Sequence, residues 1–358
     1  MPRPILARLD LDALEHNLHV ARRATRARIM AVIKAAAYGH GLMRSANALR
    51  AADGFALLDV NEAVMLREAG FSQVLLLLEG CFTPDDMALA AQYDLACVIH
   101  NPQQLTLLDA YPRRNSLQVW LKVNSGMNRL GFAPHAVPAA MEKLKSHQAV
   151  GEITLMTHFA QADEIQTRET TSVAAQLDVF DTLAAPYRVA RSLANSAALL
   201  RYPETHGDWV RPGIMLYGAS PFAETNAQDL GLRPVMTLTS ELISVRDLKA
   251  GEAVGYGALF RADSSMRVGV VACGYADGYP RHAPTGTPVL VEGQRTRTLG
   301  RVSMDMLCVD LSNIPTAAVG SRVTLWGAGL PVDEVAQAAG TISYELLCAL
   351  SARVPVAT

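Results

Sequence analysis

The chain has 358 residues, of which half are hydrophobic and 18% are charged, and its net charge is −2. This length suits a large domain and a smaller one, and the weak net charge without Lys or Arg blocks argues against nucleic acid or a membrane as partner. The N-terminus lacks an apolar signal segment, and no apolar stretch approaches the roughly 20 residues of a membrane helix. The five cysteines are scattered and suit reduced thiols, so we predict a cytoplasmic protein.

Eight short apolar runs follow one another through the first two-thirds of the chain, over residues 28–34, 54–60, 73–79, 95–100, 117–123, 152–159, 187–193 and 210–218. Helix-like segments lie between them over 61–70, 83–93, 101–110 and 136–146, several opened by Asn, Asp or Thr as N-cap. Continuous apolar strands are typically covered on both faces, which indicates a parallel sheet. The alternation fits a (β/α)8 barrel, and a doubly wound sheet would share it.

We favour the barrel because polar, reactive side chains recur where the apolar runs end. These residues are Lys34, Glu79, His100, Lys122, His158, Ser196 and Arg211. The rim at the C-terminal ends of the strands is where barrel enzymes carry their chemistry.

After about residue 229 the pattern changes to strand-like segments separated by Gly or Pro, over 235–245, 267–276, 287–293, 295–311 and 322–327. One helix is expected over 343–354. The prediction is therefore an α/β protein with a (β/α)8 TIM-type barrel over residues 9–228 and a mainly β domain over 229–358. Residues 1–8 can pack with the second domain.

Lys34 stands out because it follows an apolar run and precedes three alanines, Tyr38 and a Gly-His-Gly turn. A lysine seen alone at a strand end is more often an exposed surface charge. Here the small neighbours leave room for a ligand, and a lysine in an apolar pocket can form a Schiff base with an aldehyde. These residues alone fit either a class I aldolase or a pyridoxal phosphate (PLP) enzyme.

The segment KAAAYGHG resembles the PLP-lysine signature of the alanine racemases. Further segments resemble that family in family order, namely KVNSGMNRLGF, LMTHFA, NSAA, WVRPGIMLYG, VGYG, GYADGYPR, GRVSMDM and SYELLC. The resemblance spans nearly the whole chain, which makes it far more specific than any single short motif. One position departs from the family, because Ala36 stands where Asn or Asp is common.

The resemblance implies a PLP-dependent racemase that interconverts L- and D-alanine with two bases and no metal. Lys34 would hold the PLP aldehyde and serve as base on the D-alanine face, and Tyr256 would be the base on the L-alanine face. Since Tyr256 lies in the second domain, family analogy assigns it to the barrel of the partner subunit in a homodimer. An isolated tyrosine is protonated at neutral pH, so this role needs nearby positive charge.

The same resemblance implies how the cofactor is held. Arg211 would face the pyridine nitrogen and, because an arginine stays protonated, would leave that nitrogen unprotonated. His158 would link Arg211 to Tyr256. The phosphate would be held by the set Tyr38, Ser196, Tyr344 and the backbone amides of Gly213 and Ile214.

Substrate recognition is implied in the same way. Arg129 and the backbone N–H of Met304 would bind the alanine carboxylate, with Asp305 in support. Lys122, whose counterpart is carbamylated in many family members, would orient Arg129. Tyr275 would narrow the entrance together with the phosphate-binding Tyr344, which favours alanine or serine over larger amino acids.

Competing functions are a broader-specificity racemase acting, for example, on serine, and a non-catalytic PLP carrier. The carrier would not need the second domain, Tyr256 or Arg211. An aldolase would not need the phosphate-binding set. A racemase of this family can supply D-alanine for peptidoglycan or serve alanine catabolism, since both roles use the same site.

Overall fold

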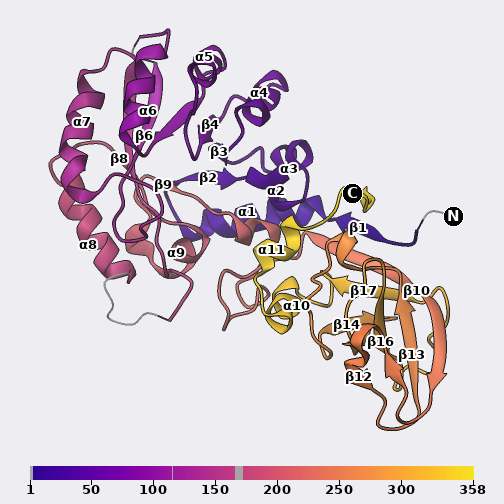
Figure 1. Ribbon diagram of the computed structural model, residues 1–358. Helices are drawn as coiled ribbons and strands as arrows, with labels where there is room; N and C mark the ends of the chain where they lie inside the picture. The colour runs from indigo at the N-terminus through magenta and orange to yellow at the C-terminus, as the bar shows by residue number, and fades with distance from the viewer. Residues whose placement is uncertain (1–2, 115, 166–171) are drawn as a thin grey trace. The chain divides into compact units, whose positions relative to one another are not determined.

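The computed structural model describes residues 3–114, 116–165 and 172–358, and its chain forms two compact units (Figure 1). The barrel unit comprises Asn17–Ala37 and Gly41–Leu216. The β unit comprises the described residues up to His16, the short segment Tyr38–His40 and Tyr217–Thr358.

Eight parallel strands close a barrel in the order in which they follow along the chain. They are β2 (Arg28–Val32), β3 (Gly54–Leu57), β4 (Val74–Leu77), β5 (Ala96–Ile99), β6 (Leu117–Lys122), β7 (Val150–Met156), β8 (Ala190–Ser192) and β9 (Trp209–Val210). Pairing of β9 with β2 completes the ring. Each of the eight predicted apolar runs overlaps one of these strands, so the predicted barrel is confirmed.

Local sequence signals explain several helices around the barrel. Asp59, Thr83 and Asn101 accept backbone N–H groups as N-caps of α4 (Val60–Glu68), α5 (Pro84–Gln92) and α6 (Pro102–Leu107), which satisfies donors that a helix start leaves open. Strands β3 and β5 are buried at every position, as expected for strands covered on both faces. The helices are α1 (Leu11–Ala24), α3 (Leu42–Ala48), α4 (Val60–Glu68), α5 (Pro84–Gln92), α6 (Pro102–Leu107), α7 (Val137–Ser146), α8 (Val173–Ala184) and α9 (Ser196–Arg201).

The β unit is built on an eight-stranded sheet in the order β13-β16-β15-β14-β17-β10-β1-β18, in which β13 also pairs with β10. Its strands are β1 (Leu6–Leu9), β10 (Met236–Leu248), β13 (Met266–Val271), β14 (Pro288–Val291), β15 (Gln294–Leu299), β16 (Leu307–Asp310), β17 (Arg322–Trp326) and β18 (Val356–Ala357). A two-stranded ribbon of β11 (Ala253–Val254) and β12 (Phe260–Arg261) is added. The predicted mainly β character of this part is confirmed, and the N-terminal strand β1 pairs antiparallel with β10.

Two features of these units differ from the sequence-based expectation. Within Tyr217–Thr358 the chain forms two α-helices, α10 (Val332–Ala339) and α11 (Ser343–Cys348), where one was predicted. The predicted eighth run ends as a strand at Val210, because Pro212 and Gly213 follow, and Ile214–Tyr217 form the 3-10 turn η4. Among the described residues, no helix is long and apolar enough to cross a bilayer.

Candidate active site

The rim of the barrel unit carries the predicted reactive side chains. Lys122 is the last residue of β6, and Arg211 follows β9 directly. Lys34 and His158 come two residues after the ends of β2 and β7. Because the C-terminal ends of parallel barrel strands share one rim, these side chains come from neighbouring positions around a single opening.

Lys34 opens a left-handed turn, α2 (Lys34–Tyr38). The φ angles of Ala35, Ala36, Ala37 and Tyr38 are 54°, 50°, 55° and 52°. A left-handed helical residue costs roughly 1–2 kcal/mol for an L-amino acid, and such strain is characteristic of functional sites. The sequence indicated small residues here as room for a ligand, but it did not predict this turn.

Positive charge accumulates at the barrel rim. Lys122 is only 8% exposed. Burial, followed by the charges of Arg211, Arg129 and Lys34, lowers the pKa of Lys122 to about 8. Glu79 acts in the opposite direction but does not offset these cations. A cluster of this kind is suited to a multiply charged anion.

The loop after β6 explains how Arg129 comes close to Lys122. The N–H of Asn124 donates to the Phe132 carbonyl at 2.9 Å, and the N–H of Phe132 donates to the Lys122 carbonyl at 2.8 Å. The Asn124 side chain accepts the N–H groups of Gly126 and Asn128 inside the loop. The segment therefore returns to the end of β6, and the exposed Arg129 lies near enough to lower the pKa of Lys122.

Arg211 is 4% exposed and its orientation is fixed by hydrogen bonds. Nη1 donates to Ser192 Oγ at 2.6 Å, and Nη2 donates to the carbonyls of Thr157 at 2.6 Å and Leu193 at 3.1 Å. Burial lowers the pKa of Arg211 to about 10, so the guanidinium is still protonated at neutral pH. Nη2 also approaches Nδ1 of His158 at 3.4 Å.

His158 is held as a neutral imidazole. A guanidinium has only donors, so Nδ1 of His158 must accept from Arg211 and carries no proton in this contact. Burial, and then the charges of Arg211 and Lys122, lower the pKa of His158 well below its usual value. The backbone of His158 is anchored by Gln176, whose Nε2 donates to its carbonyl at 3.2 Å.

Four buried polar residues that support this rim were missed in the sequence, namely Ser125, Thr157, Gln176 and Ser192. Gln176 Nε2 also donates to Ser125 Oγ at 3.2 Å, and Ser125 Oγ lies 2.7 Å from Thr157 Oγ1. The signal that could have found them is a polar residue inside an apolar segment, such as Gln176 in the VAAQLDVFDTLA helix.

Ser196, at the start of α9, is 3% exposed and lies beside the turn after β9. Its Oγ accepts the N–H of Gly213 at 2.8 Å, which leaves the hydroxyl proton to donate to an anion. Ile214, which is also buried, begins η4. Ser196, Gly213 and Ile214 are thus brought together.

Tyr38 and Tyr344 belong to the β unit and lie near each other, with ring centroids 6.0 Å apart. Tyr38 also stacks on Tyr217 at 4.6 Å. Burial, and then Cys348, raise the pKa of Tyr38, so its hydroxyl remains a donor. Gly39 has φ +80°, and a Cβ there would lie 2.2 Å from the Leu347 carbonyl oxygen, so this approach requires glycine.

Tyr256, Tyr275, Met304 and Asp305 also lie in the β unit. Tyr256 is 70% exposed and Met304 is 54% exposed in the single chain. Two backbone bonds join the turns of Tyr275 and Met304, from Tyr275 N–H to Ser303 O at 3.1 Å and from Ala276 N–H to Met304 O at 2.9 Å. The large side chains of Tyr256, Tyr275 and Met304 are therefore exposed on the surface of the β unit.

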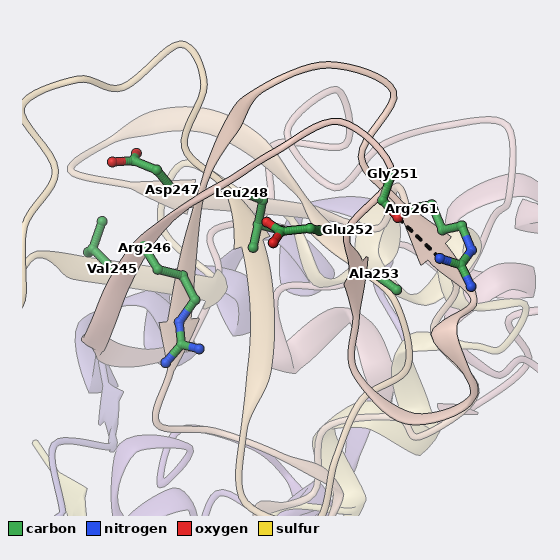
Figure 2. Close-up of a pocket in the computed structure, with 8 residues that line it drawn as sticks. All are labelled: Val245, Arg246, Asp247, Leu248, Gly251, Glu252, Ala253 and Arg261. Carbon is green, nitrogen blue, oxygen red and sulfur yellow. Dashed lines mark hydrogen bonds between the residues drawn. The ribbon is translucent and has the colours of Figure 1, made fainter.

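A hollow of about 640 Å³ on the β unit contains none of the predicted site residues (Figure 2). It is lined by Val245, Arg246, Asp247, Leu248, Gly251, Glu252, Ala253 and Arg261, and its charged side chains are exposed. The described residues also include no group of His, Cys, Asp and Glu arranged to hold a metal ion.

Comparison with known proteins identifies the class to which this fold and site belong. The family model for the N-terminal domain of alanine racemase matches residues 9–221, and that for the C-terminal domain matches residues 235–358. The chain therefore belongs to the alanine racemase family.

Relatives match along their whole length. The chain is 62% identical over 354 residues to an alanine racemase of Nitrosospira multiformis, with 99% of each chain covered. Among solved structures, the biosynthetic alanine racemase from Pseudomonas aeruginosa is 51% identical with a TM-score of 0.96, and that from Acinetobacter baumannii is 41% identical with a TM-score of 0.91. Each comparison covers 99% of both chains.

Proposed function

We propose that the chain racemises alanine with PLP as cofactor. The observation that carries this proposal is the barrel rim, where Lys34, Lys122, Arg129 and Arg211 gather around a neutral His158. The full-length match to alanine racemases supports alanine as the substrate. Because the P. aeruginosa relative is described as biosynthetic, we extend the proposal to a role in D-alanine supply.

The donor set at the rim fits PLP. The cofactor has an aldehyde, a phenolic oxygen and a phosphate, and the rim offers the Lys34 amine, the further cations Lys122, Arg129 and Arg211, and the buried hydroxyl of Ser196 for these groups. Ser196 and the N–H of Ile214 would hold the phosphate, and the N–H of Gly213, which donates to Ser196 Oγ, would position that hydroxyl. The hydroxyls of Tyr38 and Tyr344 would help. When bound, the cofactor supplies an electron-withdrawing ring that acidifies the α-proton of an amino acid.

Lys34 and Tyr256 are the two proposed bases. Lys34 would hold the cofactor aldehyde, and its amine would accept or return the α-proton on the D-alanine face. Tyr256 would do the same on the L-alanine face. Racemisation needs both, because a proton removed from one face must be returned to the other.

Arg211 would set the protonation state of the pyridine nitrogen of the cofactor. Its hydrogen bonds to Ser192, Thr157 and Leu193 leave little freedom to move, and its pKa of about 10 keeps it charged at neutral pH. A fixed cation facing the pyridine nitrogen would keep that nitrogen unprotonated. The ring would then take up less of the developing negative charge, which would disfavour side reactions such as transamination.

Lys122 would be carbamylated. Carbamylation requires a neutral amine, and a pKa of about 8 leaves a sizeable neutral fraction near neutral pH. The product is an anion, which would relieve repulsion with Arg129 and Arg211 and orient Arg129 towards the substrate carboxylate.

The enzyme would act as a homodimer in which the β unit of each subunit completes the barrel site of its partner. The exposed Tyr256 and Met304 support this arrangement, since large exposed side chains often belong to an interface. Tyr256 would supply the second base, Met304 a backbone N–H for the carboxylate, and Tyr275 a narrow entrance, with Asp305 in support.

The test is conversion of L-alanine to D-alanine, and the reverse, followed by chiral chromatography with added PLP. We expect both directions to reach the same one-to-one mixture. Lys34→Ala should lose the visible absorbance of the lysine-bound cofactor together with all conversion. Conversion by Lys34→Ala at the unmodified rate would contradict the proposal, and equal rates with serine would favour the broader-specificity racemase.

A further inference from the structure

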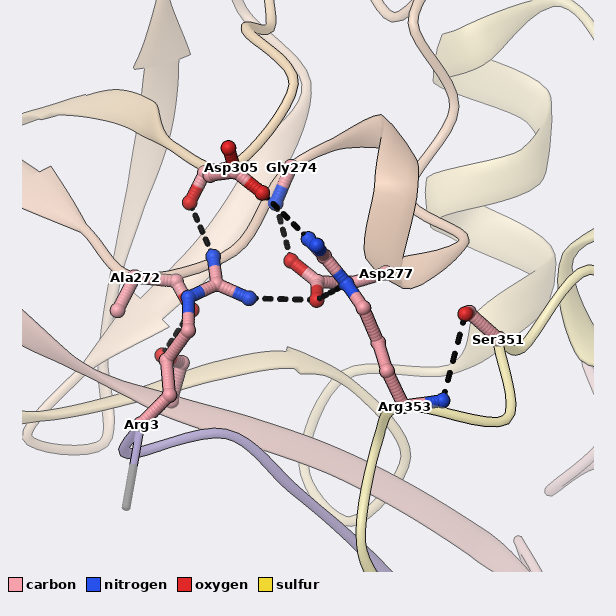
Figure 3. A network of polar contacts seen from close by, with 8 residues as sticks. Arg3, Ala272, Gly274, Asp277, Asp305, Ser351 and Arg353 are labelled. Atoms are coloured by element: carbon pink, nitrogen blue, oxygen red, sulfur yellow. Dashed lines mark hydrogen bonds and ion pairs between the residues drawn. The ribbon is translucent and has the colours of Figure 1, made fainter. Parts of the chain in front are cut away.

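Asp277 is the buried centre of an ion-pair network in the β unit (Figure 3). Its side chain is 0% exposed. Oδ1 accepts Arg3 Nη1 at 2.5 Å and Arg353 Nε at 2.8 Å, while Oδ2 accepts the Gly274 N–H at 2.9 Å. Two arginines from opposite ends of the chain thus neutralise one buried carboxylate.

The same two arginines also bind Asp305. Nη2 of Arg353 donates to the Asp305 carboxylate at 2.6 Å, and Nη2 of Arg3 donates to the Asp305 backbone carbonyl. Each arginine therefore bridges Asp277 and Asp305. The four residues link the two chain ends to two internal turns.

Those turns are the ones that carry Tyr275 and Met304. Asp277 is the last residue of the turn η6 (Tyr275–Asp277), and Asp305 directly follows Met304. A Cβ on Gly274 would lie 2.3 Å from the Ser303 carbonyl oxygen, so the two backbones are in close contact. A shift of the network would move both turns.

We propose that Asp277, clamped by Arg3 and Arg353, is a positioning residue that fixes Tyr275 and the Met304 backbone for recognition of the substrate. The inference rests on the proposed function, which assigns Tyr275 and Met304 to the site of the partner subunit. A buried ion pair adds little net stability compared with an apolar replacement. The ion pairs of Asp277 with Arg3 and Arg353 instead fix the geometry of the two turns.

The first test separates substrate binding from turnover. Arg353→Met removes one clamp from a partly exposed position, whereas Asp277→Asn would strand buried donors and could prevent folding. We expect Arg353→Met to raise the KM for alanine about tenfold with kcat changed less than about threefold, and with cofactor absorbance unchanged. Arg353→Lys, which keeps the charge, should recover most of this loss.

A matched control breaks a similar pair elsewhere in the β unit. Arg297 binds Asp310 at 3.1 Å across β15 and β16 without touching either turn. Arg297→Met should leave KM unchanged. An equal rise in KM for Arg297→Met and Arg353→Met would overturn the proposal, because any lost ion pair would then have the same effect.

The second test does not need activity. The N–H groups of Tyr275 and Ala276 are hydrogen-bonded to Ser303 and Met304, so their hydrogen exchange reports how firmly the turns are joined. Arg353→Met should accelerate this exchange and Arg297→Met should not. If the wild-type chain proved inactive, only the proposed function would fail, and exchange would still decide whether the clamp positions the turns.

The combined outcomes decide the inference. Faster exchange together with a higher KM supports it. Unchanged exchange contradicts it, whatever the KM, since the effect would not run through the turns. Faster exchange with an unchanged KM also contradicts it, because Asp277 would then be structural only.

Discussion

Lys122 is the buried cation at the barrel rim whose pKa the neighbouring positive charges lower. Its pKa falls from 10.5 to about 8 through burial and the cations Arg211, Arg129 and Lys34. Because the folded-state pKa is depressed, the unfolded chain binds more protons between about pH 8 and 10.5, and stability should rise with pH in that window. Below pH 8 the full cost of a charged Lys122 is present unless another reaction removes the charge.

Carbamylation is the proposed reaction, and it gives a direct prediction. In carbon-13 bicarbonate at pH 8, the chain should show one carbamate carbonyl resonance by NMR. Lys122→Ala should lose that resonance and part of the activity, because Arg129 would no longer be oriented. Lys143→Ala, at an exposed position of α7, should keep both. A resonance that persists in Lys122→Ala would assign the carbamate to another amine.

Among single residues, the sequence identified those that lie in a recognisable motif. It missed those whose role is to hold a site residue by a hydrogen bond. Lys34, His158 and Arg211 lie in segments that resemble the family. Ser192 and Thr157 orient Arg211 through hydrogen bonds that span 19 and 54 residues of sequence. No local pattern specifies such a bond, so only the closed barrel reveals it.

The element that distinguishes the rim is the left-handed turn Ala35–Tyr38. It directs the chain away from β2 directly after Lys34. Alanine tolerates this conformation at a cost, whereas glycine adopts it freely. The exposed Ala36, where the family commonly has Asn or Asp, is the position at which that cost can be measured.

Ala36→Gly should therefore be neutral or stabilise the fold by up to about 1 kcal/mol, because relief of strain offsets the greater freedom of the unfolded chain. Ala139→Gly, at an exposed position in the right-handed helix α7, should destabilise by about 1 kcal/mol. The comparison is made by denaturant unfolding of the two variants. Equal destabilisation at both positions would show that the turn stores no strain.

The strands and helices were more predictable than this turn. Apolar runs and N-caps such as Thr83 and Asn101 specify elements locally, and all eight barrel strands overlap the predicted runs. The helix α10 escaped prediction because it is short and Pro331, which offers no side-chain cap, precedes it. The domain boundary between residues 228 and 229 remains a prediction.

For the whole molecule, the central proposal is a site shared between two subunits. Lys34→Ala and Tyr256→Phe should each be inactive as homodimers. In a mixed dimer, the intact Lys34 of one subunit would meet the intact Tyr256 of the other. Random pairing should thus restore about a quarter of wild-type activity, since half of the dimers carry one working site of two.

Subunit exchange is verified by separating dimers that carry two different affinity tags. Each variant mixed with itself serves as control and should stay inactive. If purified mixed dimers were as inactive as the controls, Tyr256 would not act across the interface.

The most direct measurement of the two-base account is proton NMR of each alanine enantiomer in D2O with the PLP-loaded chain. For wild type, the α-proton signal of L-alanine should be lost, and chiral chromatography of the same samples should show D-alanine accumulating towards a one-to-one mixture. Tyr256→Phe should still exchange the α-proton of D-alanine through Lys34 but leave that of L-alanine in place. Exchange of L-alanine by Tyr256→Phe at the wild-type rate, or wild-type exchange without any D-alanine, would contradict the account.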